Sequence, residues 1–310
     1  MMIFFALLPL LIGEGVGDYC PIRDPFEVDE HICRINRESL PLIGIGTFCL
    51  KGHTCTEAVE YAVKVGYRII DTATVFDNFT AIAEVLQRRG RRYFYIESKV
   101  WPNHQSAREL RKDLEFTLER LGTSYLDAYF LHWPNCQIPI EETLLAMEEL
   151  RFLRKIRHIG LCNVTSSHLR RACEVGVRIT WVQVEMHPFF CDWELLEFCR
   201  ERSITVQAWA PLGRGRLSRD PMLTRIGAKY KKTAAQVAIR WIIQHGCVPL
   251  PCSRNKRHIR ENIDVADFVL TSEEMNEIDR RTRSRHRERL CDTVAGFCDE
   301  FDFSWEDCWP

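Results

Sequence analysis

The sequence predicts an α/β barrel in which eight short strands alternate with helices. Strand-like and helix-like segments alternate along most of the 310 residues, as a chain of repeated βα units requires. Three successive strand-like segments end in, or are followed directly by, a polar residue, namely Asp71, Lys99 and His132. Polar residues at the carboxyl ends of parallel strands are typical of the mouth of such a barrel.

The expected strands are short and rich in apolar or β-branched residues, and they span residues 42–47, 68–71, 94–99, 128–132, 158–161, 181–184, 205–208 and 248–249. The expected helices have apolar residues at helical spacing, and they span residues 54–65, 80–89, 106–121, 141–155, 166–175, 193–202, 234–245 and 271–281. The last of these helices is expected outside the barrel. An open sheet with helices on both faces is the alternative fold. The glycine fingerprint of the dinucleotide-binding open sheets is absent, because Gly44-Ile45-Gly46 is followed by Thr47-Phe48-Cys49.

Composition describes an ordinary globular chain. With 46% hydrophobic residues, 27% charged residues and a net charge of −1, nothing favours a nucleic acid or an anionic membrane as partner. Fourteen cysteines without a Cys-x-x-Cys pair favour free thiols in a reduced, cytoplasmic protein. The apolar start from Met1 to Gly13 keeps a secretory signal open, although no Lys or Arg precedes Arg23. In a secreted chain the terminal cysteines (Cys20, Cys33, Cys291, Cys298 and Cys308) could form disulfides.

Three segments resemble the aldo-keto reductase family: GYRIIDTA at residues 66–73, SKVW at 98–101 and LHWP at 131–134. The resemblance extends from about Leu40 to about Arg281. It implies a (β/α)8 TIM barrel that transfers hydride between a nicotinamide cofactor and a carbonyl compound. It also implies an N-terminal extension over residues 1–30, a barrel domain over 31–283 with a hairpin at 31–41 on the barrel floor, and a C-terminal tail over 284–310 near the mouth.

The family's catalytic tetrad is Asp, Tyr, Lys and His, and the resemblance assigns three members to Asp71, Lys99 and His132. The Tyr position, five residues after Asp71, holds Phe76. In the family the Tyr hydroxyl protonates the carbonyl oxygen, and the Lys lowers its pKa from about 10. A positioned general acid contributes about 10²–10⁴-fold, so a weakened reductase is predicted.

Two other interpretations stay open. A non-catalytic NADP(H)-binding or redox-sensing protein, in effect a pseudoenzyme, is the alternative function. Asp71 and Lys99 could be only a buried ion pair that ties two strands, and His132 only a core histidine.

Any residual activity would have to use His132, or a water held by Lys99 and His132. The pH profile of that activity would then be set by a histidine-like group that titrates at about 6.5.

The resemblance also assigns the cofactor residues. Asn163 in GLCN and Gln183 in VQVEMHP are implied to hold the nicotinamide carboxamide, and Trp209 in AWAPLG to stack on its ring. Ser253 matches the family's Ser beside a 2′-phosphate, while the family's usual Lys and Arg fall on Cys252 and His258. Arg254 is the candidate substitute, because a guanidinium binds phosphate bidentately. The remaining cofactor residues are Gly46, Thr47, Leu212, Gly213, His258, Glu261 and Asn262. NADPH is therefore expected as the cofactor, with NADH as the alternative.

The expected substrate pocket is aromatic. Phe48, Trp101 and Trp133, together with Phe76, match pocket-lining positions, and such a pocket suits a hydrophobic aldehyde or ketone. The alternative is that these rings only fill the top layer of the barrel. A monomer that binds a small carbonyl substrate and needs no metal is expected.

Overall fold

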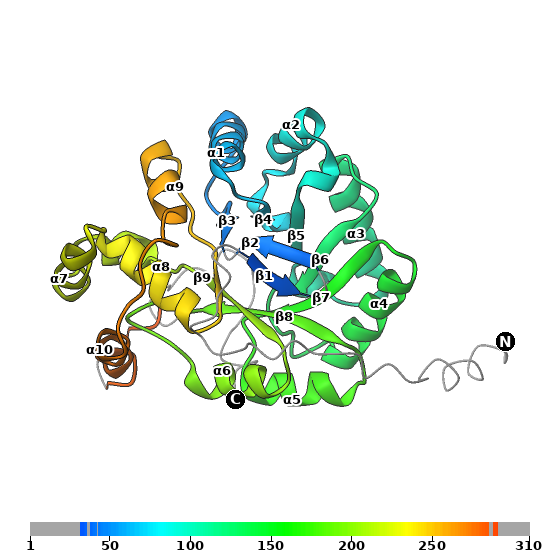
Figure 1. The fold of residues 1–310 in the computed structure, drawn as a ribbon. Coiled ribbons are helices and arrows are strands. Elements are labelled where there is room, and N and C mark those ends of the chain that lie inside the picture. The colour runs from blue at the N-terminus through cyan, green and yellow to red at the C-terminus, as the bar shows by residue number, and fades with distance from the viewer. Residues whose placement is uncertain (1–31, 36–37, 42, 285–287, 291–310) are drawn as a thin grey trace, which may run out of the picture.

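A computed structural model describes residues 32–35, 38–41, 43–284 and 288–290. Eight parallel strands, hydrogen-bonded in the order of the sequence, form a nearly closed barrel with helices around it (Figure 1). The (β/α)8 barrel predicted from the sequence is confirmed. The strands are β3 (Gly44–Gly46), β4 (Ile69–Asp71), β5 (Tyr95–Val100), β6 (Leu126–Leu131), β7 (Ile156–Cys162), β8 (Ile179–Glu185), β9 (Thr205–Trp209) and β10 (Val248–Pro249).

The helices include all eight that the sequence predicts and two that it did not. The expected ones are α1 (Gly52–Val65), α2 (Phe79–Arg89), α3 (Ala107–Leu121), α4 (Ile140–Phe152), α5 (Ser166–Glu174), α6 (Trp193–Glu201), α8 (Ala234–Gln244) and α10 (Ser272–Thr282). The unexpected ones are α7 (Pro221–Tyr230) and α9 (Lys256–Ile263). Both have a side-chain N-cap, Asp220 for α7 and Asn255 for α9. Asp and Asn are residues that often mark the start of a helix in a sequence.

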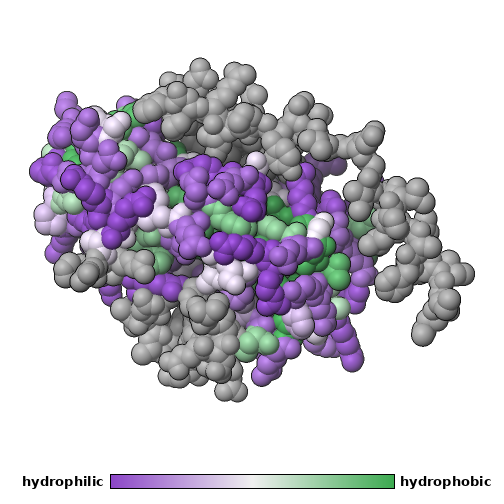
Figure 2. Space-filling view, turned by 90° about the horizontal axis from the view of Figure 1, so that it is seen from below, coloured by the Kyte–Doolittle hydropathy of each residue, from purple (hydrophilic) through white to green (hydrophobic). Residues whose placement is uncertain are grey.

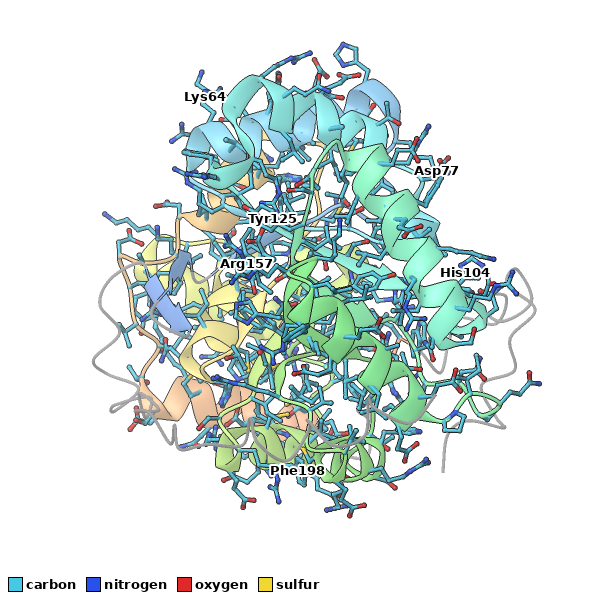
Figure 3. The ribbon with its side chains drawn as sticks, turned by 90° about the vertical axis from the view of Figure 1, so that its right-hand side faces the viewer. Lys64, Asp77, His104, Tyr125, Arg157 and Phe198 are labelled. Atoms are coloured by element: carbon cyan, nitrogen blue, oxygen red, sulfur yellow. The ribbon has the colours of Figure 1, made fainter. Side chains whose placement is uncertain are left out.

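A small antiparallel hairpin of β1 (Ile32–Ile35) and β2 (Glu38–Pro41) lies across one end of the barrel, as predicted (Figure 1). Figure 3 shows Tyr125 and Arg157 on the hairpin side, and Asp77 and His104 at the opposite end, where the strands finish. That opposite end is the mouth. The predicted extension over residues 1–30 lies outside the described residues, as does most of the predicted tail.

Close packing explains two glycines of the barrel. The seam between β3 and the end of β10 is joined by the Gly46 N–H, which donates to the Pro251 carbonyl (3.1 Å). A Cβ on Gly44 would lie 2.6 Å from a methyl carbon of Leu250, and one on Gly160 would lie 2.3 Å from the Phe130 ring.

A compact apolar cluster fills the barrel interior below the mouth. Its residues are Ile69, Tyr95, Ala128, Phe130, Cys162, Trp181, Val248 and Leu250.

A second and larger apolar core lies between the strands and the surrounding helices. The outer surface is mainly polar on the face where α5 and α6 lie, with a narrow apolar band across it (Figure 2). In the described ranges, no helix has both the length and the apolar composition to cross a membrane.

Candidate active site

Asp71 and Lys99 form the ion pair that the sequence predicts at the ends of β4 and β5. The Lys99 ammonium lies 2.5 Å from Asp71 Oδ1 and also donates to the Thr72 carbonyl (2.9 Å). Both side chains are buried, with Lys99 1% exposed and Asp71 5%. A buried charge must be paired to be tolerated, so this geometry fixes a positive charge at the mouth of the barrel.

Phe76 lies beside that charge. It ends a short turn, η2 (Thr74–Phe76), which is anchored because the Thr74 hydroxyl donates to Asp113 Oδ1 (3.0 Å). The Lys99 nitrogen lies 5.2 Å from the centre of the Phe76 ring, and the His132 ring centre is 5.9 Å away. Lys99 and His132 therefore both lie beside a ring that has no hydroxyl, close to where the sequence resemblance places them.

His132 follows β6 and is buried, and its ring packs edge-to-face with the Trp101 ring, with 5.0 Å between the ring centres. Its Nδ1 has no hydrogen-bond partner among the described residues. Burial, and then the positive charge of Lys99, lower the pKa of His132 well below its ordinary value of 6.5. This lowered pKa favours a neutral imidazole at neutral pH. If charged His132 is the proton donor, the pH profile of the activity should therefore have its midpoint below 6.5.

Asn163, Gln183 and Trp209 lie together beyond the ion pair. The Trp209 indole N–H donates to Asn163 Oδ1 (2.7 Å), and the Asn163 amide donates to the His132 carbonyl (3.0 Å). The Gln183 amide nitrogen donates to Asp71 Oδ1 (2.9 Å). We call Asp71, Lys99, His132, Asn163 and Gln183 the strand end of the site.

One cleft joins the strand end to a second group of residues on α9 and the loop before it. Its volume is about 680 Å³. We call Ser253, Arg257, His258, Glu261 and Asn262, which all line this cleft, its helix end. Arg214 and Arg219, from the turn η5 (Gly213–Arg219), line it as well. The cleft therefore has amide groups and an indole at one end and basic side chains at the other, and this donor set fits a nicotinamide dinucleotide.

Comparison with known proteins agrees with this geometry. A model of the aldo/keto reductase family matches residues 42–282. The chain belongs to the aldo/keto reductase family. The glyoxal reductase of Bacillus subtilis is 38% identical over 248 residues, which are 79% of this chain and 90% of that relative. The 9,11-endoperoxide prostaglandin H2 reductase of Trypanosoma cruzi is 37% identical over 253 residues, 79% of this chain and 88% of that relative.

Solved structures agree too. The aldose reductase of Schistosoma japonicum matches with a TM-score of 0.77 at 32% identity, over 84% of this chain and 93% of that one. An aldo/keto reductase of Brucella melitensis matches with a TM-score of 0.76 at 32% identity, over 81% and 98%. The protein is thus an oxidoreductase by family, and members of this family use nicotinamide cofactors.

Four residues that the resemblance assigned to this aldo/keto reductase's cofactor or substrate do not line the cleft in the described part of the chain: Thr47, Trp101, Gly213 and Arg254. The Thr47 hydroxyl donates to the Asp71 carbonyl (2.8 Å), and the Gly213 N–H to the Ala210 carbonyl (2.8 Å). Trp101 packs behind His132. Arg254 precedes the cap of α9, so the helix turns Arg257 rather than Arg254 into the cleft. The roles assigned to these four residues stay predictions, and the structure places the four outside the lining of this cleft.

The remaining assigned residues do line the cleft, among them Gly46, Phe48, Trp133, Trp209 and Leu212. Arg257 was not predicted from the sequence, although a prediction of α9 would have placed it on the same helix face as Glu261. Glu97 and Gln207, buried polar residues of the barrel interior, were not predicted either. Glu97 precedes Lys99 by two residues, and the period of a strand therefore puts both on one face. No cluster of three potential metal ligands occurs among the described residues.

Proposed function

We propose that this protein is an NADPH-dependent reductase of hydrophobic aldehydes or ketones whose turnover is weakened by Phe76. The observation that supports this most is the assembly of Asp71, Lys99 and His132 around the Phe76 ring, in one cleft with the cofactor residues. The relative named glyoxal reductase favours a carbonyl substrate, whereas the name of the 9,11-endoperoxide prostaglandin H2 reductase points to an endoperoxide.

The reduced nicotinamide, when bound, supplies a hydride to the carbonyl carbon. The work of this chain is to bind, to orient and to deliver a proton to the carbonyl oxygen. Asn163 and Gln183 offer the amide groups that suit the nicotinamide carboxamide. Phe48, Phe76 and Trp133 line an apolar region where a substrate side chain is desolvated.

The proton is the weak point of the reaction. Phe76 has no proton to give, and Lys99 is held by Asp71 and the Thr72 carbonyl. The neutral His132 is a poor acid at neutral pH because its pKa is lowered. Residual turnover would therefore use the small fraction of charged His132, or a water beside Lys99.

Arg257, His258 and Ser253 at the helix end favour NADPH over NADH, since a basic pair beside a hydroxyl suits the 2′-phosphate. The cysteines whose side chains are described are all free thiols. They support our proposal that the protein acts in a reducing compartment such as the cytoplasm.

A second function has its own support. The absence of a hydroxyl on residue 76 and the neutral state of His132 together favour a protein that binds NADP(H) without reducing carbonyls.

One experiment separates the two functions. Calorimetric titration with NADPH, followed by turnover on a panel of aldehydes and ketones that includes glyoxal, should show binding and slow oxidation of NADPH. Binding without turnover would favour the non-catalytic function. No heat at millimolar NADPH would rule out both.

A further inference from the structure

A chain of hydrogen bonds crosses the barrel interior from the ion pair to Glu97. Lys99 and the Gln183 amide nitrogen both donate to Asp71 Oδ1 (2.5 and 2.9 Å). The Gln183 nitrogen also donates to Gln207 Oε1 (2.9 Å), and the Gln207 nitrogen donates to Glu97 Oε1 (2.6 Å). All five side chains are at most 5% exposed. They come from β4, β5, β8 and β9, so the chain joins strands that are distant in the sequence.

The chemistry of an amide gives this chain a direction. Each Gln side chain has two N–H donors on one side and a carbonyl acceptor on the other. Two acceptors together favour one orientation of Gln183, because its nitrogen donates both to the Asp71 carboxylate and to the Gln207 oxygen. Both N–H groups of Gln183 are then used, by Asp71 and Gln207. Its carbonyl oxygen accepts from the Cys162 thiol (3.6 Å) and has a second lone pair for another donor. Gln183 and Cys162 both line the cleft.

Glu97 ends the chain and holds its direction. Gln207 presents its oxygen to Gln183 and therefore its nitrogen to Glu97, which must accept. If Glu97 offered no acceptor, the buried Gln207 nitrogen would lose its partner, and a rotated Gln207 amide would place nitrogen against the nitrogen of Gln183. Leaving a buried polar group unpaired costs more than the hydrogen bond itself contributes.

We propose that Glu97 is a positioning residue for nicotinamide recognition: through Gln207 it keeps the carbonyl oxygen of Gln183 as the acceptor for the carboxamide N–H of the cofactor. This inference rests on the proposed function. It predicts that the protein distinguishes a carboxamide from an isosteric group without N–H.

The protonation state of Glu97 selects the matched control. Burial, and then the negative charge of Asp71, raise the pKa of Glu97 well above its ordinary value; the Gln207 bond and Lys99 oppose this more weakly, and Asp127 adds to it. A neutral carboxylic acid still has a carbonyl oxygen to accept from Gln207. Glu97→Gln keeps that acceptor in a neutral side chain, whereas Glu97→Met removes the acceptor and keeps the length.

The test measures dissociation constants by calorimetry for three ligands. NADP⁺ carries the carboxamide, its 3-acetylpyridine analogue replaces the amide nitrogen with a methyl group, and 2′,5′-ADP lacks the nicotinamide. Wild type should bind NADP⁺ about tenfold more tightly than the analogue, the scale of one hydrogen bond to a buried acceptor. Glu97→Met should reduce this ratio to about two or less, and Glu97→Gln should retain it. The affinity for 2′,5′-ADP should be the same in all three proteins.

The outcomes separate this inference from the proposed function. If wild type binds neither NADP⁺ nor 2′,5′-ADP, the proposed function fails and this inference fails with it. If wild type binds both but Glu97→Met keeps the tenfold ratio, or loses affinity for all three ligands equally, Glu97 has a structural role only. If Glu97→Met does not fold, Gln207→Met interrupts the same chain at its next member and should lose the ratio in the same way; a retained ratio overturns the inference.

Discussion

The strand end and the helix end of the cleft are built in different ways. Asn163 and Gln183 at the strand end project from or just beyond barrel strands, are 5% and 2% exposed, and are hydrogen-bonded to other buried groups. At the helix end, the Arg257 side chain is 75% exposed and lies 3.5 Å from Glu261 one turn later in α9. One end is held rigidly by the barrel, and the other is held by a single capped helix.

This difference sets the size of the effects to expect. Buried and desolvated groups interact strongly, so the loss or gain of one polar atom there changes the interaction energy more than it would at the surface. Exposed charges contribute about 0–1 kcal/mol per pair and are screened by salt. Substitutions should therefore have their largest effects at the strand end and smaller ones along α9.

The largest effect should come from Phe76→Tyr. The added hydroxyl would lie near Lys99, whose nitrogen is 5.2 Å from the ring centre, and the positive charge would lower the phenol pKa. Turnover of a good carbonyl substrate at saturating NADPH should rise on the order of 10²-fold or more. Phe76→Leu is the control and should show no gain. If wild type already equals Phe76→Tyr, the proton comes from another group; if neither turns over while NADPH binds, the protein is a binding module.

The pH profile of the residual activity should also depend on the strand end. Because the pKa of His132 is lowered well below 6.5, only a small fraction of the imidazole is charged at neutral pH. That fraction rises about tenfold for each unit of falling pH until the lowered pKa is reached. Wild-type turnover between pH 8 and pH 6 should rise as the pH falls, and His132→Gln should abolish the slope. A midpoint at 6.5, or a flat wild-type profile, would show that charged His132 is not the donor.

The strand end could be predicted largely from the sequence. Asp71 and His132 each follow an apolar run, and Lys99 ends a strand-like segment. The end of a parallel strand fixes where such residues lie. The interior chain could not be predicted in the same way. Gln207 and Glu97 are 110 residues apart, and their hydrogen bond depends on which strands face each other across the barrel.

The helix end was predicted less well. Arg254 and Arg257 are both basic, and choosing between them requires the start of α9. Asn255 fixes that start by accepting from the N–H groups of Arg257 and His258 (2.9 and 3.4 Å). Arg257 lies three residues after Arg254, so the helix turns its side chain into the cleft, whereas Arg254 does not line the cleft. A resemblance between loop sequences does not distinguish these two positions.

Arg257→Ala should have an effect on NADPH affinity that is smaller than the effects at the strand end and larger than that of Arg254→Ala. If Arg257 binds the 2′-phosphate, its removal should weaken NADPH binding about tenfold, the scale of one charge-assisted contact, and leave NADH nearly unchanged. Arg254→Ala is the matched control and should change the dissociation constant of NADPH less than about twofold. The two affinities can be compared by fluorescence quenching at low and high salt. A larger loss in Arg254→Ala would restore the residue that the sequence resemblance favoured.

The smallest effect should come from the cap of α9. Asn255→Ala removes the oxygen that accepts from the first backbone N–H groups of the helix, and loss of such a cap costs about 1 kcal/mol. Arg257 and His258 follow directly, so the cost should loosen the helix end alone. NADPH should bind about two- to fivefold more weakly, amide hydrogen exchange should accelerate in α9, and exchange in the barrel strands should stay unchanged. Asn255→Ser keeps a capping oxygen and should restore both. Equal acceleration in β4 and β5 would mean that the two ends are one cooperative unit, and the contrast between a rigid and an adjustable end would then be wrong.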